Sequence, residues 1–185
     1  MSKLQIERNK RLIILILCHL LIMPAVFAQL HPVASESQIH FTIHNFGFKT
    51  GGKLAPPEGD ILFNPDDLGR SYFQVTIKSE SVDTDNEGRD EHLKEEEYFD
   101  VKKYPLIRFV SSSIRSVNNK DNYEAKGTLT IKATSREINL PFKAVKNGND
   151  WSFSGSFSMN RKDYGIGGSS TISNELNVQI DVIAR

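Results

Sequence analysis

Three short groups of residues are of the chemical types that bind metal ions or phosphate. In the first, residues 83–88, acidic side chains alternate and a glycine stands sixth, as in the first half of a calcium-binding loop. The twelfth position of such a loop carries a glutamate that binds the ion through both oxygens, whereas this chain has Lys94 there, which would repel a cation. We therefore interpret the segment as a turn that leads into a helix cap.

The second group is the pair His40 and His44, whose spacing of four would place two metal ligands on one face of a helix. The surrounding residues have the pattern of a strand instead. Four residues of strand separate the two side chains by roughly 13 Å, too far for both to bind one zinc ion. We expect outward-pointing, polar roles for these histidines and no metal site.

The third group, residues 165–168, is rich in glycine but precedes no helix, so it lacks the context of a phosphate-binding loop. We predict a flexible connection between strands there. The sequence also has no G-x-S-x-G segment, the strand-to-helix turn that presents a serine nucleophile. With no activated nucleophile, acid–base pair or metal cluster, we predict no catalytic residues, no enzyme activity and no cofactor.

The elements that hold these residues begin after an N-terminal targeting signal. Four basic side chains precede the apolar run of residues 12–23, and Val26 and Ala28 occupy the small positions of a cleavage site. A membrane anchor is the alternative, but the run is shorter than the roughly 20 residues that a helix needs to cross a bilayer. We predict a signal peptide at residues 1–28, one mature domain at residues 29–185, and a periplasmic or secreted location.

Composition limits the classes of partner and of chemistry. The full chain has a formal net charge of zero, and losing the four basic residues and one acidic residue of the signal lowers it to −3. Binding to nucleic acid needs a basic surface, so we exclude that partner. The only cysteine lies in the signal, so the mature chain has neither thiol chemistry nor disulfides and depends on packing alone.

From Ile39 onward apolar side chains alternate with polar ones, a period of two that is typical of strands with one buried face. The alternation and the turn signals between runs predict about eight strands, at residues 39–43, 61–63, 73–77, 107–109, 123–131, 138–142, 151–159 and 176–182. Parallel strands need long crossovers that the chain lacks, so we predict an all-β antiparallel barrel. A sandwich of two sheets is the competing architecture.

One segment, residues 87–98, is dense in charge and lacks the period of two. We predict a short helix there, capped by Asp85 or Asn86, with Leu93 and Phe99 on its apolar side.

Inward-facing apolar positions are the remaining candidates for a binding site. A packed core and a ligand cavity have the same pattern in a barrel, so periodicity leaves both open. The candidate ligand-binding set is Phe41, Ile43, Phe63, Phe73, Val75, Ile77, Leu93, Phe99, Ile107, Phe109, Leu129, Ile131, Phe142, Trp151, Phe153 and Phe157.

Several ordered motifs carry a resemblance to a known family over residues 37–185. They are S-V-D-T at residues 81–84, R-D-E-H-L at 89–93, Y-F-D at 98–100, Y-P-L-I-R-F at 104–109, G-T-L-T-I at 127–131 and N-R-K-D-Y-G-I-G at 160–167. In these motifs the chain resembles the YceI-like, polyisoprenoid-binding periplasmic proteins. It departs from the usual family pattern at residues 53–58, where larger apolar residues are common.

The resemblance implies a lipocalin-like, eight-stranded antiparallel barrel with a short helix near its mouth. It implies carriage or storage of a long-chain isoprenoid or similar amphiphilic lipid, such as a quinone or a polyprenol, with fatty acids and their amides as further candidates. Transient contact with a membrane is compatible with this role. Arg89, Asp90, His92 and Tyr164 are candidates for binding a polar head group at the mouth, although Arg89 and Asp90 could equally fix the helix to the barrel. A packed structural or protein-interaction barrel without a lipid is the alternative function.

Overall fold

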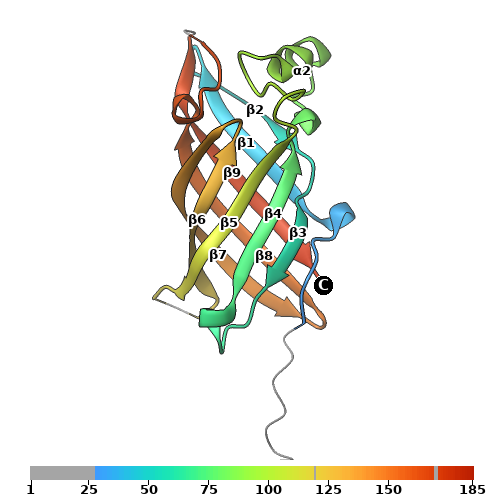
Figure 1. The fold of residues 1–185 in the computed structure, drawn as a ribbon, viewed down its shortest axis with the longest axis vertical. Coiled ribbons are helices and arrows are strands. Elements are labelled where there is room, and N and C mark those ends of the chain that lie inside the picture. Colours follow the sequence, from blue (N-terminus) through green and yellow to red (C-terminus); the bar gives the residue numbers. More distant parts are fainter. Residues whose placement is uncertain (1–27, 119, 169–170) are drawn as a thin grey trace, which may run out of the picture.

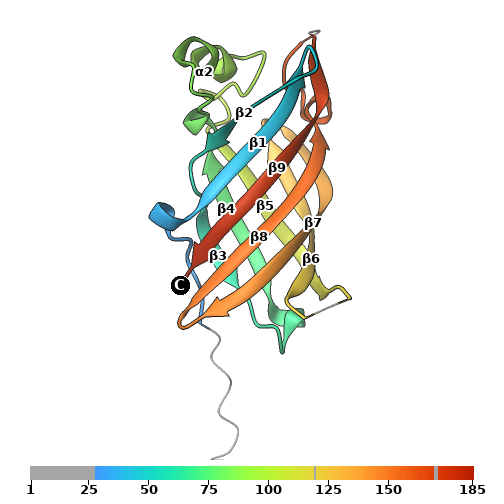
Figure 2. The same cartoon turned by 180° about the vertical axis from the view of Figure 1, so that it is seen from behind.

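The computed structural model describes residues 28–118, 120–168 and 171–185, so the predicted signal peptide lies outside the described residues except for Ala28. One antiparallel sheet curls into a barrel and has the strand order β2-β1-β9-β8-β7-β6-β5-β4-β3 (Figures 1 and 2). Its strands are β1 (Gln38–Asn45), β2 (Phe48–Leu54), β3 (Glu58–Leu62), β4 (Tyr72–Lys78), β5 (Leu106–Ser116), β6 (Asn122–Ile131), β7 (Thr134–Asn147), β8 (Asp150–Asn160) and β9 (Ile172–Ala184).

The helical elements are short: η1 (Ala34–Glu36), η2 (Leu68–Arg70), η3 (Ser79–Ser81), α2 (Glu87–Lys94) and η4 (Arg161–Tyr164). Asn86 caps α2, because the backbone N–H of Arg89 donates to its side-chain oxygen at 2.9 Å. The helix ends four residues before the predicted position, where three consecutive glutamates would place negative charge at the negative end of the helix dipole. No helix in the described ranges is long and apolar enough to cross a membrane.

The predicted fold, an antiparallel barrel of about eight strands with one short helix, is confirmed, and the strand that the pattern did not reveal is β2. Its sequence, FKTGGKL, does not alternate between apolar and polar residues, because two of its positions are glycines. Neighbouring backbone and side chains come so close to these two positions that a larger residue would not fit. A Cβ atom on Gly52 would lie 2.5 Å from the carbonyl oxygen of Asp83 and 2.8 Å from both the Phe41 ring and the Thr84 methyl group. Only glycine leaves room for these contacts.

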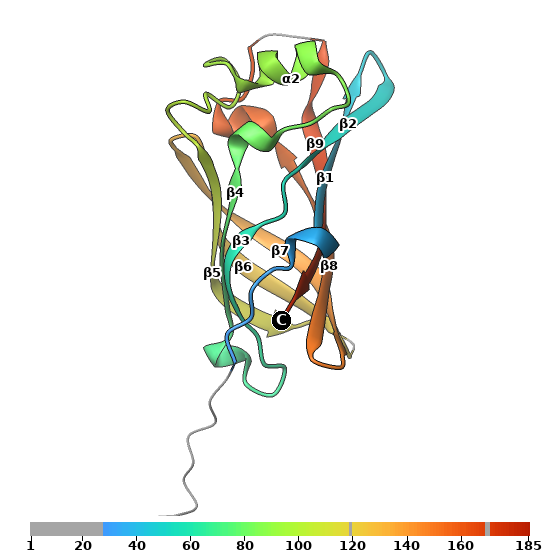
Figure 3. The same ribbon diagram turned by 90° about the vertical axis from the view of Figure 1, so that its right-hand side faces the viewer.

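The two edge strands, β2 and β3, follow each other in the chain, so the chain itself closes the barrel. Residues 55–57 separate them, and β2 pairs with β1 while β3 pairs with β4. Two short segments pair with the free edges. Leu30 and Ile61 exchange backbone hydrogen bonds of 2.7 and 2.9 Å, and Lys53 and Asp83 exchange bonds of 2.8 and 3.0 Å. The N-terminal segment runs alongside β3 in Figure 3.

The end of the barrel opposite α2 is filled by aromatic rings, and we call it the closed end. Phe63 lies at the centre of this cluster, with its ring centroid 5.0 Å from those of Tyr123 and Trp151 and 5.4 Å from that of Phe153, all in edge-to-face geometry. Phe142 also contacts it, at 5.9 Å. Such pairs stabilise a core by more than the burial of their surface area. Because the rings fill this end of the barrel, the cluster closes it.

The close approach at Gly52 generates the first prediction. Gly52→Ala should force the segment at Asp83 away from β2 and destabilise the domain by about 1–3 kcal/mol. That loss lowers the melting temperature by roughly 2–4 °C per kcal/mol for a chain of this size, measured by circular dichroism. Gly69→Ala is the matched control, because its Cβ would meet only the Asp67 carboxylate oxygen, at 3.7 Å. Equal melting temperatures for the two variants would contradict the proposed role of Gly52.

Candidate functional site

A cavity of about 280 Å³ occupies the barrel between the aromatic cluster and α2. All nine strands contribute to its wall, and most of the lining side chains are apolar. The wall follows from the period of two, because every second side chain of a strand in a closed sheet points inward. Ile, Leu and Val are the commonest residues of this wall, whereas aromatic rings fill the closed end.

The length of the cavity can be estimated from β9, whose wall residues run from Ile172 to Val182. Ten strand residues rise about 33 Å, or about 25 Å along a barrel axis to which strands are tilted by about 40°. One leaflet of a bilayer has a hydrocarbon thickness of about 15 Å, half of the bilayer core. The wall is therefore long enough to cover a lipid tail that spans one leaflet.

The structure places fourteen of the sixteen candidate ligand-binding residues on the cavity wall. They are Phe41, Ile43, Phe73, Val75, Ile77, Leu93, Phe99, Ile107, Phe109, Leu129, Ile131, Phe142, Phe153 and Phe157. Phe63 and Trp151 are not on the wall but in the aromatic cluster at the closed end. Alternation along a strand predicts which side chains point inward, but not how far along the barrel axis they lie. The sequence therefore did not separate these two residues from the others.

Further wall residues were not among the candidates. They include Ile39, Leu54, Ile61, Thr84, Tyr98, Ile138, Leu140, Met159, Arg161, Ile166, Ile172, Leu176, Val178, Ile180 and Val182. The alternation of β9 is visible in the sequence, so its apolar members could have been included among the candidates. Arg161 belongs to the family motif at residues 160–167, but the alternation does not mark it as a wall residue, because it follows β8 and reaches the wall only through the fold.

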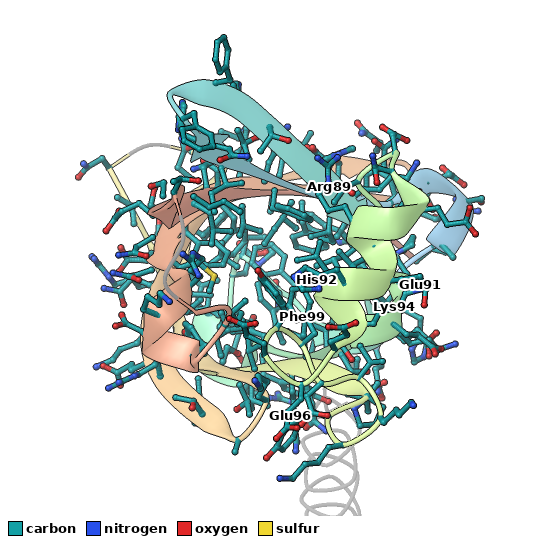
Figure 4. All side chains as sticks on the ribbon, turned by 90° about the horizontal axis from the view of Figure 1, so that it is seen from above. Arg89, Glu91, His92, Lys94, Glu96 and Phe99 are labelled. Atoms are coloured by element: carbon teal, nitrogen blue, oxygen red, sulfur yellow. The ribbon has the colours of Figure 1, made fainter. Side chains whose placement is uncertain are left out.

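The mouth of the cavity is the end of the barrel that carries α2, the β1–β2 turn and residues 165–168. Arg89 is exposed there and also lines the cavity, so the cavity meets solvent beside it (Figure 4). Its Nε donates to the Thr84 hydroxyl oxygen at 2.7 Å, and its Nη2 donates to the Thr84 carbonyl oxygen at 2.6 Å. The guanidinium group is thereby held in one orientation, and within the described residues its Nη1 has no hydrogen-bond partner.

The other three head-group candidates do not line the cavity. Asp90 accepts from the backbone N–H of Thr84 at 2.9 Å and from the Thr84 hydroxyl, so it fixes the segment that orients Arg89. The ring of His92 packs edge-on against Tyr98, with the centroids 4.8 Å apart, on the side of α2 that faces the opening in Figure 4. Tyr164 is only 3% exposed, and burial raises the pKa of its hydroxyl, which keeps it uncharged.

A second arginine of the wall, Arg161, is only 5% exposed. Its guanidinium group donates to the backbone carbonyls of Ile166 at 2.7 Å, Ser173 at 3.0 Å and Ile172 at 3.3 Å. A buried cation needs such partners because its hydration is lost. Arg161 therefore holds the connection between η4 and β9 beside the mouth.

The glycine-rich segment packs tightly against this arginine. A Cβ atom on Gly167 would lie 2.7 Å from Arg161 Nη1 and 2.9 Å from the Tyr98 ring, and the backbone there has φ +70°. The N–H of Gly167 donates to the carbonyl of Glu97 at 2.7 Å. Glycine is thus required by close packing between this segment and the turn after α2, rather than by phosphate binding.

The two histidines at positions 40 and 44 lie on the outer side of β1. His40 Nε2 is 2.8 Å from the side-chain oxygen of Gln38, and His44 is exposed. Among the residues that the structure describes, no three His, Cys, Asp or Glu side chains are arranged to hold a metal ion.

Comparison with known protein families identifies residues 30–184 as a YceI-like domain. A UPF0312 protein of Pseudomonas paraeruginosa is 30% identical over 135 residues, which cover 69% of this chain and 70% of that protein. A UPF0312 protein of Serratia proteamaculans is also 30% identical, over 69% of each chain.

Solved structures share the fold. BcnA of Burkholderia cenocepacia has a TM-score of 0.79 at 23% identity, covering 83% of this chain and 99% of BcnA. The YceI protein of Campylobacter jejuni has a TM-score of 0.63 at 29% identity, covering 71% and 82%. A polyisoprenoid-binding domain of Saccharophagus degradans implicated in plant cell wall breakdown has a TM-score of 0.69 at 12% identity, covering 84% and 97%.

The contrast between wall and closed end generates the second prediction. In Val75→Asp the new carboxylate would face a cavity that admits water, so the variant should fold and lose binding of an apolar fluorescent probe such as N-phenylnaphthylamine. In Phe63→Asp the carboxylate would be buried among rings. It should cost several kcal/mol of a total stability of about 5–15 kcal/mol and unfold the domain.

Circular dichroism melts and probe titration measure the two effects separately. Unfolding of Val75→Asp would show that this position is packed, and unchanged probe binding in a folded Val75→Asp would show that the probe does not occupy the cavity.

Proposed function

Since the chain belongs to the family of YceI-like domains, we propose that it is an exported, soluble carrier or store of a long-chain isoprenoid-type lipid held in the barrel. The cavity carries this proposal: an apolar space lined by all nine strands, filled by rings at one end and opening beside Arg89 at the other. We further propose a periplasmic or secreted location after cleavage near Ala28, which rests on the pattern of residues 1–28.

The physical advantage for such a ligand is the burial of its tail. Each carbon moved from water into an apolar interior contributes roughly 0.8 kcal/mol, so one five-carbon isoprene unit contributes about 4 kcal/mol before ordering costs. Wall residues such as Val178, Leu129 and Ile107 offer an aliphatic surface of the same polarity as the tail. Several units therefore suffice for stable retention in water.

We assign the polar head of the lipid to Arg89. Thr84 already occupies two of its guanidinium nitrogens, and Nη1, which has no hydrogen-bond partner in the described residues, can donate to an oxygen acceptor of a quinone, an alcohol or an acidic group. Asp90 serves as a positioning residue for this arrangement through Thr84. His92 and Tyr98 offer an aromatic edge beside the same opening.

Binding without chemistry is the second part of the proposal. The described mouth pairs its polar groups with one another and with backbone atoms, as Arg89 does with Thr84 and Arg161 with three carbonyls, rather than as a nucleophile and a base. The alternative of a packed structural or interaction barrel requires a filled interior. The cavity above the rings favours the carrier.

Native mass spectrometry tests the carrier directly. Protein taken gently from the periplasmic or secreted fraction of its host should have the mass of a chain starting at Gln29 plus a retained lipid that extraction identifies as an isoprenoid. Delipidated protein should regain that mass difference when it is loaded with a polyprenol or an isoprenoid quinone. Failure to retain any lipid both after isolation and after loading would end the carrier proposal, and retention of the leader would end the export proposal.

The head-group assignment makes a separate prediction. Arg89→Met should weaken the binding of a polyprenol or quinone by about 10- to 150-fold, since a charge-assisted hydrogen bond contributes about 1.5–3 kcal/mol. It should not change the binding of a polyisoprenoid hydrocarbon without a polar head. Arg108→Met, on the outer face of β5, is the matched control. Equal losses for headed and headless ligands would place the head elsewhere.

A further inference from the structure

The turn between β1 and β2 holds two phenylalanines in solvent, although exposed aromatic rings normally pack or bind something. Phe46 is 73% exposed and Phe48 is 79% exposed, the highest values among the large apolar residues of the described chain. The turn lies at the mouth, and the hairpin projects beyond the barrel wall in Figure 3. An exposed pair of this kind marks a surface for interaction.

The backbone of this turn is unusual for an aromatic residue. Asn45 pairs with Phe48, so Phe46 and Gly47 are the two central residues, and both have positive φ, +49° and +82°. Asparagine, aspartate and glycine are the residues that usually occupy such turns, because a bulky side chain is strained in the left-handed region. Folding gains nothing from Phe46 in solvent, so its strained position indicates a function outside the folded domain.

Charge and size select the partner. Residues 38–54 contain Lys49, Lys53 and two histidines but no aspartate or glutamate, and Lys49 is exposed next to Phe48. Two phenylalanine rings cover at most about 500 Å², less than the roughly 800 Å² that each partner buries in a stable protein interface. A convex apolar tip beside a cation instead fits the interface of a phospholipid bilayer, which deforms around it and carries anionic head groups.

The tip is also continuous with the cavity. Phe48 shares the inward-facing side of the hairpin with its pairing partner Asn45, and Asn45, Ile43 and Thr50 all line the cavity. A tip inserted into a bilayer would therefore bring the mouth to the membrane surface, with an unbroken path from the acyl region along the hairpin into the barrel.

We propose that the β1–β2 turn is a membrane-docking device, in which Phe46 and Phe48 insert into the bilayer interface and Lys49 contacts anionic head groups. The docking goes beyond lipid storage and does not require that any particular cargo is bound. It gives the mouth a fixed direction toward the membrane during loading or release.

Co-sedimentation with vesicles of phosphatidylethanolamine and phosphatidylglycerol tests this proposal. The double variant Phe46→Ser/Phe48→Ser should partition on the order of 100-fold less than the parent, about tenfold for each ring. Tyr72→Ser is the matched control: it removes an exposed ring at the closed end and should leave partitioning within about twofold. Replacing the anionic lipid by phosphatidylcholine, or raising salt from about 0.05 M to about 0.5 M, should weaken binding of the parent through Lys49.

A second measurement places the tip in the bilayer. Phe48→Trp in a Trp151→Phe background leaves one tryptophan, whose emission should shift to the blue when vesicles are added and should be quenched by brominated acyl chains. Unchanged emission would overturn the proposal, as would equal vesicle binding of the parent and the double variant. A parent that forms a dimer lost in the double variant, without vesicle binding, would overturn it in favour of self-association through the tip.

Discussion

Closure of a single curled sheet is the constraint on which the rest of this molecule depends. An apolar interior can stay hollow only if water cannot enter between strands, and the edges β2 and β3 do not pair with each other. The chain covers these edges with backbone hydrogen bonds. Leu30 pairs with Ile61 of β3 near the closed end, and Asp83 pairs with Lys53 of β2 near the mouth. Because these bonds use main-chain atoms, the closure is compatible with many different interiors.

Side-chain size then divides the interior into a packed part and a hollow part. A barrel of about eight strands is just wide enough to be filled by large side chains. Around Phe63 the rings meet in the centre and form a close-packed core. Above this core Ile, Leu and Val outnumber the aromatic side chains of the wall, and a cavity of about 280 Å³ remains between them. The packed part therefore stabilises the domain, and the hollow part, further along the barrel axis, provides the space for a ligand.

The two charged residues of the cavity wall, Arg89 and Arg161, both lie at the mouth, where each is held by specific partners. Arg161 is buried at a desolvation cost that three backbone carbonyls offset, and Arg89 is oriented by Thr84 while remaining in contact with solvent. The rim combines this oriented cation with the apolar tip at Phe46. A lipid passing between a bilayer and the barrel would then keep its tail among apolar groups and its head beside the guanidinium group.

The sequence by itself determined the fold class, the family and which side chains of most strands point inward. The alternation of apolar and polar residues, the turn residues and the family motifs can all be read locally along the chain. It also located the helix and limited its cap to Asp85 or Asn86, of which the structure shows Asn86. It did not predict β2, whose glycines serve a close approach to Phe41 and Asp83 that only the folded chain contains. The alternation of inward and outward side chains likewise could not separate Phe63 in the packed end from residues of the cavity wall. Height along the barrel is set by strand tilt and stagger, which are properties of the closed sheet as a whole and not of any one segment.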